Sequence, residues 1–352
     1  MSEEPLTLNQ VRKNAKAKMK GICGVFGVCD GEPNRICQGN SYGKPLGFGG
    51  IGSGESFANN SRALKAIRLK MNLISEHFIP DTNYNFFGHE LAMPIMGGSV
   101  SGVNSFGGDK VITEVDFCNA VIQGCKLAGS IGWRGDTYSY KLACPYGLNA
   151  IAESDGSGVK IVKPREQEVI KEYFKCAEQS KVYAVGIDID GFGSYMMAKH
   201  NCPVFRKNQK ELKELVQSTT LPVILKGIMT VEDALMAVKT GASAIVVSNH
   251  GGRVLDCTPG TASVLAEIVK TVDGKIKILV DGGVRTGFDV LKMLALGAEA
   301  VLIGRDIVRA AIGGGSRGVQ LQMEYLQKDL AKAMLMTGVR SLQDITPVLL
   351  MK

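Results

Sequence analysis

The stretch AIVVSNHGG, residues 244–252, joins four apolar residues directly to a polar turn that contains a histidine and two glycines. Seven other runs follow the same plan from residue 91 onward, each separated from the next by enough chain for a helix. They are LAMPIMGG (91–98), LAGSIGW (127–133), VKIVKP (159–164), YAVGIDID (183–190), PVILKG (222–227), KILVDGG (277–283) and AVLIGR (300–305). Apolar runs at this spacing are typical of buried parallel strands joined by right-handed crossovers. Eight of them within about 215 residues predict an α/β fold, a (β/α)8 TIM barrel, rather than an open doubly wound sheet.

The chain before residue 91 has a different character. Residues 8–20 alternate apolar and basic positions as a helix does, and a glycine- and cysteine-rich stretch follows that predicts a long wrapping loop. We therefore divide the chain into an N-terminal helix and loop segment, 1–90, and a barrel, 91–352. Within the barrel, TVEDALMAVKTGA predicts a helix with Thr230 as its N-cap and Gly241 at its end.

The nine cysteines are an odd number in a long chain, which fits reduced thiols better than a disulfide framework. Cys23, Cys29 and Cys37 lie close together in the glycine-rich loop, but their spacing lacks the paired C-x2-C knuckles of zinc and iron–sulfur sites. We expect no metal site, and whether these three cysteines meet around a metal stays open at this point.

Composition and charge narrow the class of protein. Apolar residues make up 45% of the chain, which excludes disorder. The net charge of +7 comes largely from scattered lysines, so we expect a solvated surface and not a nucleic-acid groove. The positive charge would also favour the binding of anionic ligands. The charged N-terminus lacks the apolar centre of a signal peptide, and no stretch approaches the ~18 apolar residues of a membrane helix. We expect a cytoplasmic protein without a membrane partner.

In a barrel of this kind, the chemistry lies at the C-terminal ends of the strands. Two strand ends there combine glycine with arginine, in DGGVRTG (281–287) and IGRD (303–306), and such pairs suit a phosphate; the alternative is that the glycines only make tight turns. Lys226 at another strand end needs a negative partner. His250 can accept a proton near neutral pH, and Arg253 beside it can hold a carboxylate.

These residues resemble those of a known family. The segments LPVILKGIMTVEDALMAV, IVVSNHGGRVLD and ILVDGGVRTGFDVLKMLALGAEAVLIGR, with a closing GVRSLQDI, are similar to the FMN-dependent 2-hydroxy-acid oxidases and dehydrogenases, which include glycolate oxidase, lactate oxidase and the flavocytochrome lactate dehydrogenases. The resemblance is strong over 221–345, recognisable over 91–220 and weak or absent before residue 90.

The resemblance implies a role for each matched position. His250 would be the base that takes a proton from the substrate, Arg253 the anchor of its carboxylate, and Lys226 the cation beside the flavin ring. Of two carboxylates on the fourth run, Asp188 and Asp190, we select Asp188 as the one that orients His250, because its spacing to Gly193 matches the family. The positions implied to bind FMN are Gly98, Ser99, Val100, Lys160, Lys226, Ser248, Asp281, Gly283, Arg285, Gly304 and Arg305.

The chain also departs from the family pattern on the substrate side. The third run, VKIVKP, has Lys160 where the family has a tyrosine, and the fourth run has Gly186 in place of a threonine. Tyr195 stands near the expected place of a second carboxylate-binding arginine. The cofactor half therefore matches the family, while the substrate half is rebuilt.

The leading hypothesis for function is an FMN enzyme that oxidises a small L-2-hydroxy acid, such as lactate or glycolate, to the 2-oxo acid. A second is a flavin barrel that acts on another, phosphorylated substrate, as the type 2 isopentenyl-diphosphate isomerases do. A third is a flavin-binding protein without catalysis. The resemblance implies a homotetramer and leaves the electron acceptor, oxygen or another, open.

Overall fold

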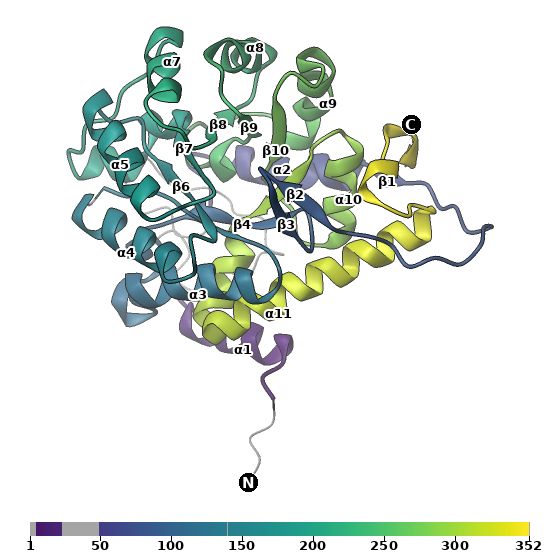
Figure 1. Cartoon of the computed structure of the whole chain (residues 1–352). Coiled ribbons are helices and arrows are strands. Elements are labelled where there is room, and N and C mark those ends of the chain that lie inside the picture. The colour runs from purple at the N-terminus through teal and green to yellow at the C-terminus, as the bar shows by residue number, and fades with distance from the viewer. Residues whose placement is uncertain (1–4, 23–48, 139, 352) are drawn as a thin grey trace.

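The computed structural model describes residues 5–22, 49–138 and 140–351, with the side chains of 140–145 left aside (Figure 1). Cys23, Cys29 and Cys37, and the wrapping loop predicted around them, lie outside the described residues. In the described part, the chain builds one closed barrel of parallel strands surrounded by helices, so the predicted (β/α)8 fold is confirmed.

Each of the eight predicted apolar runs supplies one barrel strand. The strands are β4 (Ile95–Val100), β5 (Gly132–Arg134), β6 (Gly158–Val162), β7 (Ala184–Asp188), β8 (Val223–Ile228), β9 (Ala244–Val247), β10 (Lys277–Val280) and β11 (Ala300–Ile303). They pair in chain order, and the barrel closes where β11 meets β4, with Val301 opposite Ile95. Both faces of the strands are buried, since one set of side chains fills the barrel and the other meets the helices. This double burial is why the runs are continuously apolar.

The barrel is surrounded by helices that follow the strands in the chain. They are α3 (Glu114–Leu127), α4 (Tyr140–Ala152), α5 (Gln167–Gln179), α7 (Gln209–Gln217), α8 (Val231–Thr240), α9 (Thr261–Val272), α10 (Gly287–Ala295) and α11 (Arg305–Thr337). A short α6 (Tyr195–Lys199) stands between β7 and α7. The predicted caps of α8 are confirmed: the Thr230 hydroxyl accepts a hydrogen bond from the Asp233 amide, and Gly241 has a φ of 81°.

Single 3-10 turns lie at the strand ends and in connections. They are η1 (Val103–Phe106), η2 (Gly108–Lys110), η3 (Ile189–Gly193), η4 (His250–Gly252), η5 (Leu342–Asp344) and η6 (Pro347–Leu349). Two of them, η3 after β7 and η4 after β9, carry residues that the sequence singled out. The rim of the barrel at this end is therefore built from short, tightly turned backbone.

The N-terminal segment packs on the outside of the barrel in two places. The helix predicted over 8–20 is α1 (Leu8–Lys18), and it lies along α11 (Figure 1), close enough that a Cβ added at Gly313 would come within 2.0 Å of the Val11 carbonyl oxygen. A second helix, α2 (Glu55–Ala66), packs against η4 and α9. The segment before the barrel thus reaches the rim where His250 lies.

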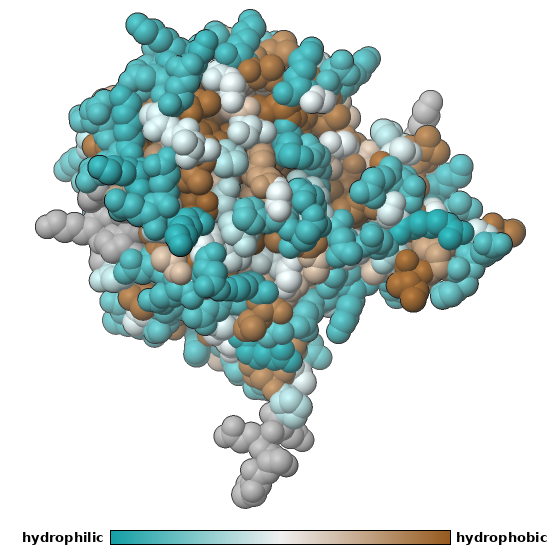
Figure 2. All heavy atoms as spheres, viewed as in Figure 1, coloured by the Kyte–Doolittle hydropathy of each residue, from teal (hydrophilic) through white to brown (hydrophobic). Residues whose placement is uncertain are grey.

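The opposite end of the barrel is closed by a hairpin. Its strands are β2 (Tyr84–Phe86) and β3 (His89–Leu91), and their apolar side chains join the cluster inside the barrel, with the Phe86 ring 6.3 Å from that of Trp133. A separate two-stranded ribbon pairs β1 (Arg68–Leu69) with β12 (Leu350–Met351). Apolar side chains are exposed beside this ribbon, among them Ile74 and Val348, and Figure 2 shows brown patches on that lobe. None of the helices in the described ranges combines the length and hydropathy needed to cross a bilayer.

Candidate functional site

A cavity opens at the C-terminal end of the barrel strands, where the sequence placed the chemistry. Most of the site residues predicted from the sequence line it. These are Gly98, Ser99, Val100, Asp188, Lys226, His250, Arg253, Asp281, Gly283, Arg285, Gly304 and Arg305. The cavity also has a less polar wall, which the sequence did not reveal, formed by Phe106, Tyr138, Tyr195, Met196, Met197 and Val254.

Lys160 does not line this cavity, contrary to its prediction as a cofactor-binding residue. It is completely buried, its Nζ donates to the Gly135 carbonyl oxygen at 2.7 Å, and it lies 5.5 Å from the ring of Tyr173 on α5. Successive side chains of a strand point to opposite faces, and position 160 falls on the face toward the helices. Lys160 therefore belongs to the layer between β6 and α5.

Ser248 also lies outside the cavity lining, but it supports two residues that belong to it. Its hydroxyl oxygen accepts a hydrogen bond from Lys226 Nζ at 3.1 Å and from the His250 backbone amide at 3.1 Å. Ser248 is fully buried. In this structure it ties the end of β8 to the turn after β9.

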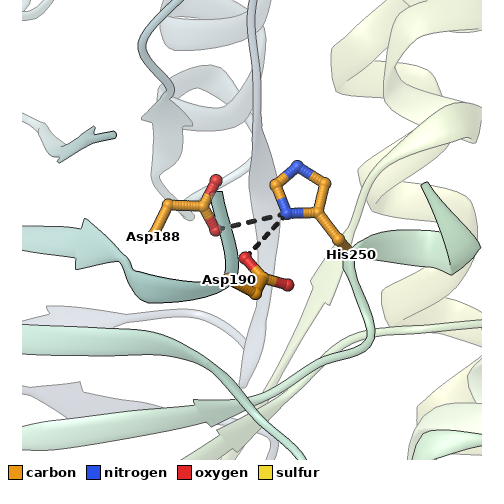
Figure 3. A group of neighbouring side chains, drawn as sticks. All are labelled: Asp188, Asp190 and His250. Carbon is orange, nitrogen blue, oxygen red and sulfur yellow. Dashed lines mark hydrogen bonds and ion pairs between the residues drawn. The ribbon is translucent and has the colours of Figure 1, made fainter. Parts of the chain in front are cut away.

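The turn after β9 holds His250 in an unusual backbone conformation. His250 has a φ of 57°, and Gly251 and Gly252 follow with φ values of 62° and 75°. Three consecutive left-handed residues are readily reached only when glycine supplies most of them. The turn aims the imidazole across the rim toward β7, so that Nδ1 meets carboxylates of that strand end (Figure 3).

Two carboxylates face the same ring nitrogen of His250. Asp190 Oδ1 is 2.9 Å from Nδ1, a hydrogen bond, and Asp188 Oδ1 is 3.5 Å from it (Figure 3). The selection of Asp188 alone as the orienting group therefore needs correction, because the hydrogen bond is made by Asp190. Asp190 lies beyond the strand in η3, where the backbone turns back toward His250, and strand alternation does not predict that.

Asp188 is the centre of a buried ion-pair network. Its carboxylate lies 2.6 Å from Lys163 Nζ and 3.2 Å from Lys226 Nζ, and Lys226 also lies 3.6 Å from Asp281. Burial opposes the ionisation of Asp188, but the neighbouring His250 and the ammonium groups of Lys163 and Lys226 outweigh it, so the pKa of Asp188 lies well below its usual value. Burial likewise opposes the charge on Lys226, yet Asp188, Asp281 and Asp190 raise its pKa. Both groups are ionised at neutral pH.

Lys163 is the functional residue that the sequence prediction missed. It follows the last residue of β6, lines the cavity, and places Nζ 3.4 Å from Nε2 of His250. A signal was present, because Lys163 stands at the C-terminal end of the run VKIVKP, whereas Lys160 stands inside it. The strand-end rule favours Lys163.

The neighbours of His250 determine which nitrogen carries the proton of the neutral ring. Ionised carboxylates only accept hydrogen bonds, so Nδ1 beside Asp190 must carry the proton. An ammonium only donates, so Nε2 beside Lys163 must present its lone pair. In the neutral ring, the free lone pair is thus on Nε2, beside Lys163.

The cluster of Asp188, Asp190 and His250 brings its ligand atoms within 4.8 Å of one another, a separation that a metal ion can use. The two lysine ammonium groups on Asp188 already supply the positive charge that a cation would bring. The arrangement therefore favours an ion-pair network over a cation site.

The predicted phosphate-binding end is formed by β10 and β11. Arg285 and Arg305 both line the cavity there; Arg285 lies 3.7 Å from Asp306, and Arg305 donates to the Gly251 carbonyl oxygen at 2.8 Å while its guanidinium lies 4.3 Å from the Phe57 ring centroid. Gly304 directly precedes α11, and a Cβ there would meet no atom closer than 3.8 Å. The backbone at Gly304, the start of α11 and the guanidinium groups of Arg285 and Arg305 thus lie around one part of the cavity, an arrangement that suits an anion.

Two glycines near this end of the barrel, Gly283 and Gly252, are required by packing, and the sequence alone does not show this. A Cβ on Gly283, whose φ is 78°, would lie 2.8 Å from backbone atoms of Asn60 in α2, and one on Gly252 would lie 2.5 Å from the Phe57 amide nitrogen. These two positions need glycine because α2 packs against the rim. Arg253 contacts the same segment, since its Nη1 donates to the Gly49 carbonyl oxygen at 3.3 Å.

Comparisons with known proteins agree with this geometry. Residues 195–352 match the family model of the FMN-dependent dehydrogenases. The matched segment, which is less than half of the chain, is similar to this family. A peroxisomal (S)-2-hydroxyacid oxidase of Arabidopsis thaliana is 48% identical over 137 residues, which are 39% of this chain and 38% of that protein. The 2-hydroxyacid oxidase 1 of Homo sapiens is 46% identical over 143 residues, 41% of this chain and 39% of that protein. The chain thus matches well under half the length of these relatives.

The likeness to solved structures extends over almost the whole chain. A mandelate oxidase structure with (S)-2-phenylpropionate is 26% identical, with a TM-score of 0.75, and the match covers 97% of this chain and 96% of that one. Another mandelate oxidase structure, described with a C4a-OH-FMN adduct, is 28% identical with a TM-score of 0.71 over 84% of this chain and 91% of that one. The likeness in structure therefore includes the half of the barrel that the family model leaves unmatched.

Proposed function

We propose that this protein binds FMN and oxidises a small L-2-hydroxy acid to the 2-oxo acid, with His250 as the base. The observation that carries the proposal is the environment of His250: carboxylates hold Nδ1, and the lone pair of Nε2 faces a cavity that Arg253 and Lys226 also line. A proton acceptor beside a carboxylate anchor suits a substrate that has a hydroxyl next to its acid group.

The residues of the cavity fit the cofactor. Asp281 Oδ1 is buried without a hydrogen-bond partner and lines the cavity, so it can accept a hydrogen bond from a ribityl hydroxyl. Arg285 and Arg305 with the open backbone at Gly304 suit the phosphate, and Lys226 supplies a fixed positive charge for the ring. When bound, FMN supplies the acceptor for the two electrons that leave the substrate.

Other residues of the cavity bind the substrate and accept its proton. Arg253 holds the substrate carboxylate, which fixes C2 of the acid near His250. His250 Nε2 accepts one proton, and the carboxylates of Asp188 and Asp190 stabilise the imidazolium that forms. A homotetramer is part of the same proposal, and a solution mass four times the 37.6 kDa of the chain would test it.

Anaerobic spectroscopy tests the function directly. We expect the purified protein to be yellow and its visible absorption to bleach on addition of glycolate, L-lactate or L-mandelate, with D-lactate as the matched control. A yellow protein that no 2-hydroxy acid bleaches would contradict the proposed activity, and a colourless protein that does not take up FMN would contradict the cofactor.

A further inference from the structure

Lys163 adds a cation at the atom where the chemistry of the site takes place. Its Nζ lies 2.6 Å from Asp188 Oδ2 and 3.4 Å from Nε2 of His250, the nitrogen that carries the free lone pair. The side chain is only 9% exposed, and it lines the cavity together with His250 and Arg253. A substrate atom that approaches Nε2 must therefore also approach this ammonium group.

The position of Lys163 is built by its surroundings. Its backbone amide donates to Asp136 Oδ2 at 3.0 Å, and that buried carboxylate is held in turn by Arg165 at 2.7 Å and by the Tyr173 hydroxyl at 3.2 Å. Gly191 leaves room for the side chain, since a Cβ there would lie 2.7 Å from Lys163 Cδ. Asp136 after β5, Arg165 and Tyr173 before and on α5, and the backbone of η3 thus direct one lysine toward His250.

We propose that Lys163 binds the C2 oxygen of the substrate; this rests on the proposed oxidation of a 2-hydroxy acid. In the free protein, the ammonium donates to the lone pair of His250 Nε2. When the acid binds with its carboxylate on Arg253, its C2 oxygen replaces His250 Nε2 as the acceptor of the hydrogen bond from Lys163. Nε2 is then free to accept a proton. Lys163 therefore keeps the base in the right tautomer and polarises the C–O bond.

The reaction balances with this assignment. Oxidation removes two electrons and two protons from the acid while the C2–O bond becomes double. One proton passes to His250 Nε2, and the electron pair with the other proton passes to the flavin. Electron density that builds on the C2 oxygen meets the positive charge of Lys163, a fixed electrostatic stabilisation of the kind that lowers barriers in buried sites.

The charged groups around His250 are three carboxylates and two ammonium groups, placed so that each ring nitrogen has a partner. Asp188 and Asp190 face Nδ1, Lys163 faces Nε2, and Lys226 and Asp281 lie one step further along the network. Lys163 and Asp190 act on opposite sides of the ring, so the donor at one nitrogen and the acceptor at the other favour the same tautomer. Their effects on orientation therefore add.

Paired ligands separate this role from a purely structural one. The variant Lys163→Met removes the ammonium but keeps a long side chain, and binding to the FMN-loaded protein is measured for pyruvate, which has a C2 oxygen, and for propionate, which lacks it. We expect the Kd of pyruvate to rise by about tenfold or more, the usual loss for a hydrogen bond to a charged group, and that of propionate to change less than about threefold. Equal losses for both ligands, or none, would overturn the proposal.

Two control variants complete the comparison. Arg253→Met should weaken both ligands, because it removes the anchor of the carboxylate. Lys171→Met alters a lysine on α5 that pairs with Glu168 and Glu214 away from the cavity, and it should weaken neither. If the wild-type protein is not bleached by any 2-hydroxy acid, the proposed function fails, while the contact of Lys163 with the base is still tested as follows.

Nitrogen NMR of the histidine rings reads that contact without substrate. We expect Nε2 of His250 to lack a proton and Nδ1 to carry one, with the signals assigned from their loss in His250→Gln among the four histidines of the chain. In Lys163→Met, the Nε2 signal of the neutral ring should move, because its lone pair loses the neighbouring ammonium donor. An unchanged Nε2 signal, or a proton on Nε2 of the neutral ring in the wild-type protein, would overturn the role of Lys163.

Discussion

The rim of the barrel has two halves that differ in their match to the family model and in the groups that they present. The strands β8 to β11 lie in the segment that matches the family model, and their ends present Lys226, His250, Asp281 and Arg305. The strands β4 to β7 lie before that segment, and Lys163 and Asp190 at their ends contact His250. The comparison teaches that side chains from both halves meet at His250, because each strand end contributes separately to the rim.

Removal of His250 tests the point where the two halves meet, and it should have the largest effect. We expect His250→Ala to retain FMN, since the groups proposed for the phosphate and ribityl chain are unchanged, and to reduce the rate of flavin bleaching by about 10²–10⁴, the usual range for a positioned base. Rapid-mixing spectroscopy under anaerobic conditions measures the rate. The exposed His77→Ala serves as a control that should leave it unchanged. Unaltered bleaching in His250→Ala would refute the assignment of the base.

The half of the rim formed by β4 to β7 has two carboxylates that can be compared, Asp188 and Asp190. Asp188→Asn leaves the buried ammonium groups of Lys163 and Lys226 without their shared partner, and we expect it to lower the free energy of unfolding by about 3–5 kcal/mol. Asp190→Asn removes the hydrogen-bond partner of His250, and Asp190 makes no direct ion pair with either lysine, so its effect on stability should be about 1 kcal/mol while bleaching still slows. Chemical denaturation of both variants measures the difference. Equal losses would mean that Asp188 does not centre the network.

The same pair predicts a dependence on pH. The pKa of Asp188 is lowered in the folded protein, so its contribution to stability is fully present above the unfolded value of about 3.9 and is lost as the pH falls through the folded value. The stability difference between the wild-type protein and Asp188→Asn should therefore be constant near neutral pH and shrink below about pH 4. A difference that shrinks already between pH 7 and pH 5 would contradict this interpretation.

A substitution in the half that matches the family model should have a smaller effect. Arg285→Met removes one cation from the proposed phosphate site, and we expect the Kd of FMN to rise by about tenfold to a hundredfold, as for loss of a hydrogen bond to a charged group. The bleaching rate of the protein that still holds FMN should stay near the wild-type value, because Arg285 pairs with Asp306 and not with the residues that contact His250. Fluorescence titration of FMN measures the first quantity. A slowed rate at full occupancy would mean that the two halves of the rim are not independent.

The sequence predicted some parts of the site well and others poorly, for physical reasons. The eight strands were predictable because burial on both faces demands continuous apolar runs, and most of the residues at their ends line the cavity. Lys160 was a wrong choice because its place inside a strand turns it toward α5, while Lys163, three residues on, stands at the end. The N-terminal helix α2 and its contact with Gly252 and Gly283 had no signal, since such contacts join residues nearly two hundred positions or more apart.

The amino-acid sequence by itself determined the barrel, its rim and the presence there of a histidine, an arginine and lysines, because hydrophobic periodicity and strand ends are local properties of the chain. Only the tertiary structure decided which of them touch. Asp190 took the hydrogen bond of His250 because η3 folds it back beyond the strand, and Lys163 reached Nε2 because the end of β6 and the turn after β9 face the same cavity. Hydrogen bonds and ion pairs depend on distances of a few ångströms between separate strands, and these distances are fixed only when the barrel closes.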